Sequence, residues 1–110
     1  MELIEDMNVE LGEIIAHRSL TKEKNGQNSE ILVLIGKPQQ MDEGYAFITP
    51  YQLRGVGTEN VRYAGGVDTI QSLQLAMKMI GVELEVLNNK PGIRISWDAG
   101  EQGEFGFPTA

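Results

Sequence analysis

The chain has no cysteine, a single histidine and no long apolar run. Without cysteine it can form neither a disulfide framework nor a thiolate zinc site, and a cytoplasmic, reducing location is the natural expectation. His17, standing alone, excludes a histidine-based triad or a multi-histidine metal site within one chain. The longest apolar run covers residues 31–35, far too short for a membrane span, and the acidic start lacks the positive charge of a secretory signal. We predict no cofactor, no metal and no membrane association.

Positive charge is also scarce. Nine Lys and Arg residues stand against 16 Asp and Glu residues, which gives a formal net charge of -7. A surface of this sign repels phosphate backbones and anionic lipids, so a nucleic-acid partner is not expected. Because the acidic residues are scattered, solubility explains them well, and a basic protein partner is also compatible with them.

The 110 residues have the length and apolar content (41%) of one globular domain, with no repeat and no linker. We predict a single domain over residues 1–110, in which 1–12 and 98–110 are peripheral. The patterns described below predict an α+β fold. An antiparallel sheet of about four to six strands carries one main helix, at about residues 68–80, on one face.

A β-hairpin is predicted around Asn25-Gly26, the pair best suited to the positive φ angles of a type I′ turn. Its strands cover residues 13 to about 21 and 30–37, with Leu20 opposite Ile31. One face of the hairpin is the expected core face, with Arg18 as its lone charged residue; it carries Ile14, Ala16, Leu20, Ile31, Val33 and Ile35. The other face is mixed, and its Leu32 and Leu34 need cover from the C-terminal segment or from a second subunit.

Two more strands are predicted before the helix. The first covers residues 45–53, where Pro50 lacks a ladder donor and therefore indicates an edge position or a bulge. The second covers residues 59–64 and ends before Gly65-Gly66, which release the chain into the helix.

The helix is expected to begin at Asp68, an N-cap residue with Gln71 three positions later, as in a capping box. Gly81 suits the left-handed position that ends a helix. The predicted buried stripe consists of Ile70, Leu73, Ala76, Met77 and Ile80. A brief strand at 84–87, a turn at 88–92 and a strand at 93–97 follow, and two aromatic residues near the end, Phe105 and Phe107, are expected to dock on the domain.

Five ordered motifs carry a family resemblance. They are IAHRSLT at 15–21, IGKP at 35–38, PYQL at 50–53, GGVDTIQSLQLA at 65–76 and GFP at 106–108. Together they resemble a small bacterial family classed as a domain of unknown function, over residues 14–108. The resemblance implies a compact prokaryotic α+β domain and brings no known activity with it.

One cluster stands out as a candidate interaction surface. Tyr51, Arg54, Arg62 and Tyr63 gather around the turn at Gly55 to Gly57, and Tyr and Arg are enriched among interface hot spots. The alternative is that the tyrosines pack at a sheet edge while the arginines partly balance the excess of acidic residues. With Leu32 and Leu34, these residues form the predicted interaction surface.

The first functional hypothesis is a non-enzymatic protein-binding or structural module that acts as a homodimer or on another protein. A sharper version is an immunity or inhibitor protein for a bacterial toxin, since a small acidic domain can cap a basic active site. The second hypothesis is a small enzyme with its site near Gly65-Gly66. There Arg62 would hold an anionic substrate and Asp68 would serve as base, although Asp68 is better explained as a helix cap. No catalytic residue is predicted.

Overall fold

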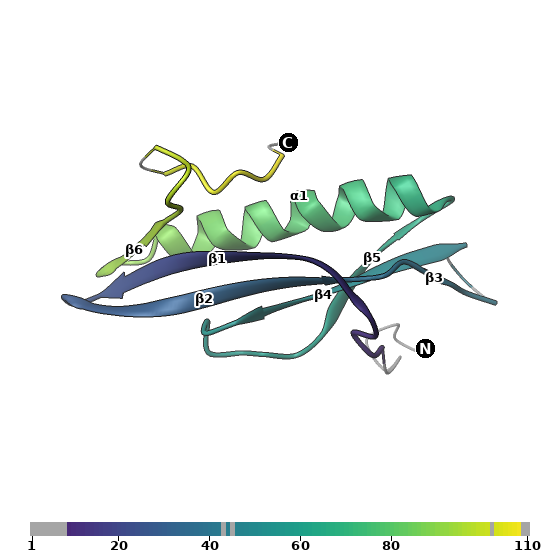
Figure 1. The fold of residues 1–110 in the computed structure, drawn as a ribbon, viewed down its shortest axis with the longest axis horizontal. Coiled ribbons are helices and arrows are strands. Elements are labelled where there is room, and N and C mark those ends of the chain that lie inside the picture. Colours follow the sequence, from purple (N-terminus) through teal and green to yellow (C-terminus); the bar gives the residue numbers. More distant parts are fainter. Residues whose placement is uncertain (1–8, 43, 45, 102, 109–110) are drawn as a thin grey trace.

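The computed structural model describes residues 9–42, 44, 46–101 and 103–108. In this part of the chain one antiparallel sheet of six strands carries one helix across one face (Figure 1). The strands are β1 (Ile14–Lys24), β2 (Gln27–Gly36), β3 (Gln39–Gln40), β4 (Phe47–Arg54), β5 (Arg62–Gly66) and β6 (Ile93–Ser96), and the helix is α1 (Thr69–Asn88). The predicted α+β class is confirmed. No described helix is long and apolar enough to cross a membrane.

The hairpin of β1 and β2 forms as predicted. Asn25 and Gly26 have φ angles of 52° and 85°, as a type I′ turn requires. Leu20 pairs with Ile31. The strands run closer to the turn than expected, since Lys24 still pairs with Gln27. A two-residue turn keeps both backbones within ladder distance up to the turn itself, so the polar residues beside it are also strand.

β4 lies inside the sheet, so the edge position considered for Pro50 is wrong. Tyr51 pairs with β2 on one side and with β5 on the other. β4 pairs with β3 through Phe47 and Ile48 and with β2 from Tyr51 onward. Pro50 falls between these two ladders, where its missing N–H disturbs neither of them. The bulge considered at Pro50 is not seen either, because β4 pairs with β5 in one unbroken register from Phe47 to Tyr51, with Pro50 opposite Tyr63.

β5 runs through Gly65 and Gly66, whereas the sequence predicted a strand ending before them. The reason is the close approach of the helix. A Cβ on Gly66 would lie 2.5 Å from the backbone nitrogen of Ser72. Only a glycine lets this strand pass directly against the first turn of α1.

The start of α1 is the predicted one. Asp68 is the N-cap, and its Oδ1 accepts a hydrogen bond from the backbone N–H of Gln71 (2.7 Å). The Gln71 side chain in turn accepts from the N–H of Val67 (2.8 Å). Behind the cap, the hydroxyls of Ser72 and Thr49 share a buried hydrogen bond of 2.8 Å that joins the first turn to β4.

The predicted end of α1 at Gly81 is wrong, as is the brief strand at 84–87. The helix continues to Asn88. A glycine inside a helix costs only about 1 kcal/mol relative to alanine, and full burial of Leu84 in the next turn exceeds that cost. The C-terminal segment also packs against Gly81, which has no side chain in the way. A Cβ at this position would lie 3.2 Å from the Cβ of Phe107.

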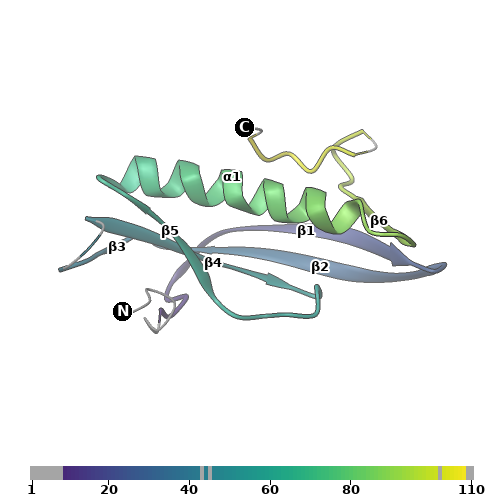
Figure 2. The same cartoon turned by 180° about the vertical axis from the view of Figure 1, so that it is seen from behind.

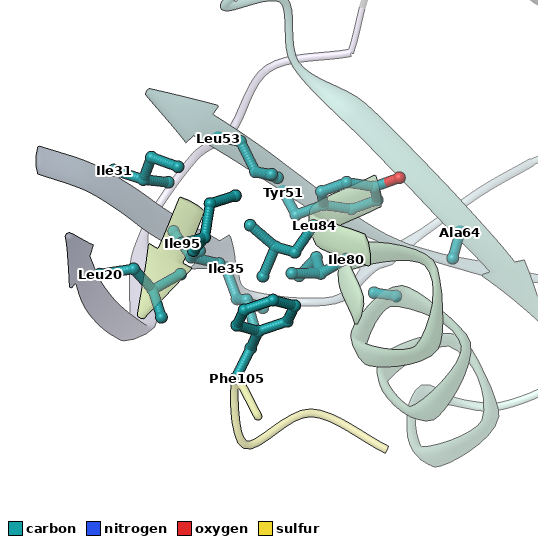
Figure 3. Packing of buried hydrophobic residues seen from close by; sticks show 12 residues of the cluster. Leu20, Ile31, Ile35, Tyr51, Leu53, Ala64, Ile80, Leu84, Ile95 and Phe105 are labelled. Atoms are coloured by element: carbon teal, nitrogen blue, oxygen red, sulfur yellow. The ribbon is translucent and has the colours of Figure 1, made fainter. Parts of the chain in front are cut away.

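The core lies between α1 and the sheet (Figure 3). Four residues of the predicted core face are buried, namely Leu20, Ile31, Val33 and Ile35. Ile14 and Ala16 are exposed, and the pairing of β1 with β2 is irregular between them. On the helix, Ala76 and Ile80 are buried as predicted, but Ile70 is exposed because Ser72 occupies the buried position of the first turn.

The C-terminal segment, residues 97–101 and 103–108, lies on the helix side of the sheet (Figure 2). Phe105 is buried in the core and Phe107 packs against it, which confirms their predicted docking. Arg18, the lone charged residue of the core face, holds this segment. Its Nη1 donates to the carbonyl oxygens of Phe105 (3.0 Å) and Gly106 (2.8 Å), and its guanidinium lies 4.0 Å from the centre of the Trp97 ring.

Candidate functional site

A cleft opens between α1 and the connection from β4 to β5. It has a volume of about 490 Å³, and we call it the α1 cleft. Its apolar wall is made of Leu53, Val56, Val82, Val86 and Leu87, and its polar lining of Tyr51, Gln52, Thr58, Asn60, Arg62, Glu83 and Lys90. A cleft that combines an apolar wall with polar groups is the usual form of a binding site.

Strand register places two polar residues of the α1 cleft side by side. Tyr51 and Arg62 are directly paired on β4 and β5, so both side chains lie on the face that carries the helix. Glu83 of α1 contacts both of these side chains from the helix side. Its Oε2 accepts a hydrogen bond from the Tyr51 hydroxyl (2.7 Å), and its Oε1 forms an ion pair with Arg62 Nη1.

These three groups satisfy one another. Burial raises the pKa of Tyr51 well above its usual value, and the hydrogen bond to Glu83 and the negative charge of that carboxylate raise it further. The Tyr51 ring lies in the core and its oxygen points away from the aliphatic side chains (Figure 3). Tyr51 therefore remains a hydrogen-bond donor, while Arg62 neutralises Glu83. The arrangement fastens α1 to β4 and β5.

Next to the α1 cleft, α1 carries a row of solvent-exposed apolar side chains. We call this row the α1 seam: Leu75, Met79, Val82 and Val86, whose exposed fractions are 38%, 41%, 50% and 56%. Their spacing of four, three and four residues is the heptad spacing of a helix that packs on another helix. Leu75 and Met79 directly precede the buried Ala76 and Ile80, so they are rotated by about 100° from the core.

A second cavity, of about 300 Å³, lies on the other flank of α1 beneath the C-terminal segment. Its lining includes Trp97, Phe105 and Phe107. Val82 lines this cavity and the α1 cleft as well. This half-exposed valine therefore lies between the α1 cleft and the second cavity, and the α1 seam borders both of them.

The predicted interaction residues do not form one surface. Tyr51 and Arg62 face the helix. Tyr63 pairs with Pro50, and Arg54 with Leu32, so these residues lie on the opposite face of the sheet. Strand alternation separates neighbours such as Arg62 and Tyr63, although they are adjacent in sequence.

Leu32 and Leu34 also lie on that opposite face. Leu34 is only 8% exposed. The C-terminal segment does not cover these leucines, because it lies on the helix side. Residues 9–12 do reach the opposite face, where the carbonyl oxygen of Leu11 lies 2.0 Å from the place of a Cβ on Gly36. The role of Leu32 and Leu34 in self-association stays a prediction.

Neither the α1 seam nor the role of Glu83 was predicted from the sequence. Both depend on residues beyond Gly81, where the helix was expected to end. Once the helix is extended through Gly81, the 75-79-82-86 spacing is visible as a second apolar row beside the buried one. The signal was present in the sequence, and the wrong helix boundary concealed it.

The residues of the enzyme hypothesis are already engaged. Asp68 caps α1, and Arg62 is paired with Glu83. Among the described residues, no three His, Cys, Asp or Glu side chains converge on a point where a metal ion would sit.

Comparison with known proteins identifies the family. No curated protein and no solved structure matches the chain. A family described as Domain of unknown function (DUF6968) matches residues 16–109, nearly the same stretch over which the five motifs carry their resemblance. The chain belongs to this family, DUF6968.

Proposed function

We propose that this chain is a non-enzymatic protein-binding module that receives an amphipathic helix of its partner on the α1 seam. The observation that carries the proposal is the seam itself: four large apolar side chains at heptad spacing, each between 38% and 56% exposed. α1 already buries a full stripe of its own against the sheet, so the fold does not need the seam.

The α1 seam leaves apolar side-chain area in contact with water. A row of apolar side chains in water contributes no stability to the monomer. Burial of these side chains against a partner stabilises the complex by about 25 cal/mol per Å² of apolar surface removed from water. Contiguous patches of this kind on soluble proteins are typical of interaction sites. The apolar wall of the α1 cleft, with Val82 and Val86 shared between cleft and seam, extends the area that a partner can bury.

The polar neighbours of the seam also favour binding over catalysis. Tyr51, Arg62 and Glu83 are already paired with one another, so they form a fixed rim beside the apolar row. A partner that covers the seam leaves this rim intact, and the Glu83 carboxylate keeps Arg62 as its counter-charge.

The test is photo-crosslinking in the native host. A photoreactive amino acid replaces Val82 in one variant and Ile70 in the control. Ile70 is equally a solvent-exposed apolar residue of α1 but lies outside the seam. We expect protein adducts from position 82 and few from position 70, with the adducts identified by mass spectrometry. Equal yields at the two positions, or none at either, would contradict the proposal.

A further inference from the structure

We infer that the helix received by the α1 seam is α1 of a second copy of this chain, packed antiparallel about a twofold axis between Met79 and Val82. This inference rests on the proposed function and names its partner. It uses three features of the seam: the symmetry of its spacing, the sizes of its side chains and the charges beside it.

The spacing of the seam reads the same in both directions. Intervals of four, three and four residues are unchanged when the helix is reversed, so a twofold axis maps the row onto itself. A dimer with such an axis requires one patch that is complementary to itself. In the antiparallel arrangement Leu75 lies opposite Val86 of the second copy, and Met79 lies opposite Val82 of the second copy.

The side-chain sizes fit this pairing. The larger residues, Leu75 and Met79, occupy the N-terminal half of the seam, and the two smaller valines occupy the C-terminal half. Each antiparallel layer therefore places a large side chain against a small one, which is the interdigitation that gives dense packing between helices. A parallel arrangement would place Leu75 against Leu75 and Val86 against Val86, with uneven layers.

Charge complementarity also favours the antiparallel arrangement. Lys78 and Glu85 are exposed and directly precede Met79 and Val86, so both lie on the same side of the seam. In an antiparallel pair this side of one helix meets the same side of the other, which brings Lys78 of each copy near Glu85 of the other. A parallel pair would instead direct Lys78 to Glu83 of the second copy. Glu83 is already held by Arg62 and Tyr51.

These opposite charges matter because two copies of an acidic chain repel each other. The formal net charge is -7 on each copy. Lys78 lies beside the middle of the seam, so it places one positive charge of each copy where the two helices approach most closely. Such a pair of exposed charges determines the relative direction of the helices more than it adds affinity.

Sedimentation equilibrium is the first measurement, at protein concentrations up to about 1 mM, which populates dimers of even millimolar affinity. We expect a dimer for the wild type. Val82→Lys should weaken its association by at least about tenfold, whereas the control Ile70→Lys should leave it unchanged. Lys78→Glu and Glu85→Lys should each weaken it, and the double variant should restore it, since exchanged charges still meet in the antiparallel pair.

Helix direction is tested by cysteine crosslinking, which is clean because the chain has no cysteine of its own. A mixture of Leu75→Cys and Val86→Cys chains should give a disulfide between unlike chains on mild oxidation. Leu75→Cys alone should give little crosslink. Preferential crosslinking of Leu75→Cys with itself would overturn the antiparallel arrangement.

Failure of this inference is distinct from failure of the proposed function. A wild-type chain that remains monomeric at about 1 mM, yet forms an adduct with a different protein from position 82 in cells, overturns the second copy as partner and leaves the binding function standing. A monomer without any adduct from position 82 overturns both.

Discussion

Gly106→Ala is the sharpest test of how the C-terminal segment is held. Gly106 has a φ of 77°, and a Cβ added there would lie 2.4 Å from Trp97 and 2.5 Å from Nη1 of Arg18. The left-handed backbone costs a non-glycine residue about 1–2 kcal/mol, and forcing a methyl group into such contacts costs typically about 1–3 kcal/mol more. We expect a loss of about 2–5 kcal/mol in the free energy of unfolding.

The chain provides a matched control in the same segment. Gly103 has a similar φ of 84°, but an added Cβ meets nothing within 4 Å. Gly103→Ala therefore isolates the backbone term and should cost only about 1–2 kcal/mol. The difference between the two variants measures the contact that Gly106 makes with Arg18 and Trp97.

The assay is urea denaturation followed by fluorescence of Trp97, the single tryptophan of the chain. If the methyl group forces the segment off the sheet, the native emission of Gly106→Ala should shift to the red, because Trp97 loses the cover of Arg18. An equal denaturation midpoint for the two variants, with unchanged native emission, would refute the reasoning.

Three further predictions concern α1 and its fastenings. Tyr51→Phe should lower the free energy of unfolding by about 1 kcal/mol, because Glu83 loses a hydrogen bond. The folded-state pKa of Tyr51 is raised, so the stability that its hydroxyl contributes is complete below about pH 10 and is lost as the pH rises further. In urea melts the variant should therefore lose less stability at alkaline pH than the wild type. Asp68→Ala should cost about 1 kcal/mol by circular dichroism melts, with sedimentation unchanged; altered sedimentation would give Asp68 a role beyond capping. Ser72→Ala should cost about 1–3 kcal/mol, because it removes the hydrogen-bond partner of the buried Thr49 hydroxyl. Thr49→Val should cost less, because the Ser72 hydroxyl still donates to the carbonyl oxygen of Thr69. The double variant should cost less than the sum of the two, and strict additivity in urea melts would contradict this.

Features whose causes lie within a few residues could be predicted from the sequence. Asn25-Gly26 specifies the turn, and the turn then sets the register of β1 and β2. Asp68 and Gln71 specify the start of α1 through bonds that span three or four residues. Alternation along β2 identified its buried face, since a strand has only two faces to choose between.

The tertiary structure alone decided the features that depend on segments far apart in the chain. Gly81 looks like a helix end by local rules, yet burial of Leu84 and the docking of Phe107 keep it helical. Arg18 seems misplaced on a core face until the C-terminal segment, almost ninety residues later, supplies two carbonyl oxygens for it. The free energy of such contacts belongs to pairs of distant residues, so no local stretch of sequence contains it. The α1 seam combines the two cases: its spacing is present in the sequence, but only the packing of the sheet and the C-terminal segment on the other faces of α1 determines that these four side chains stay exposed.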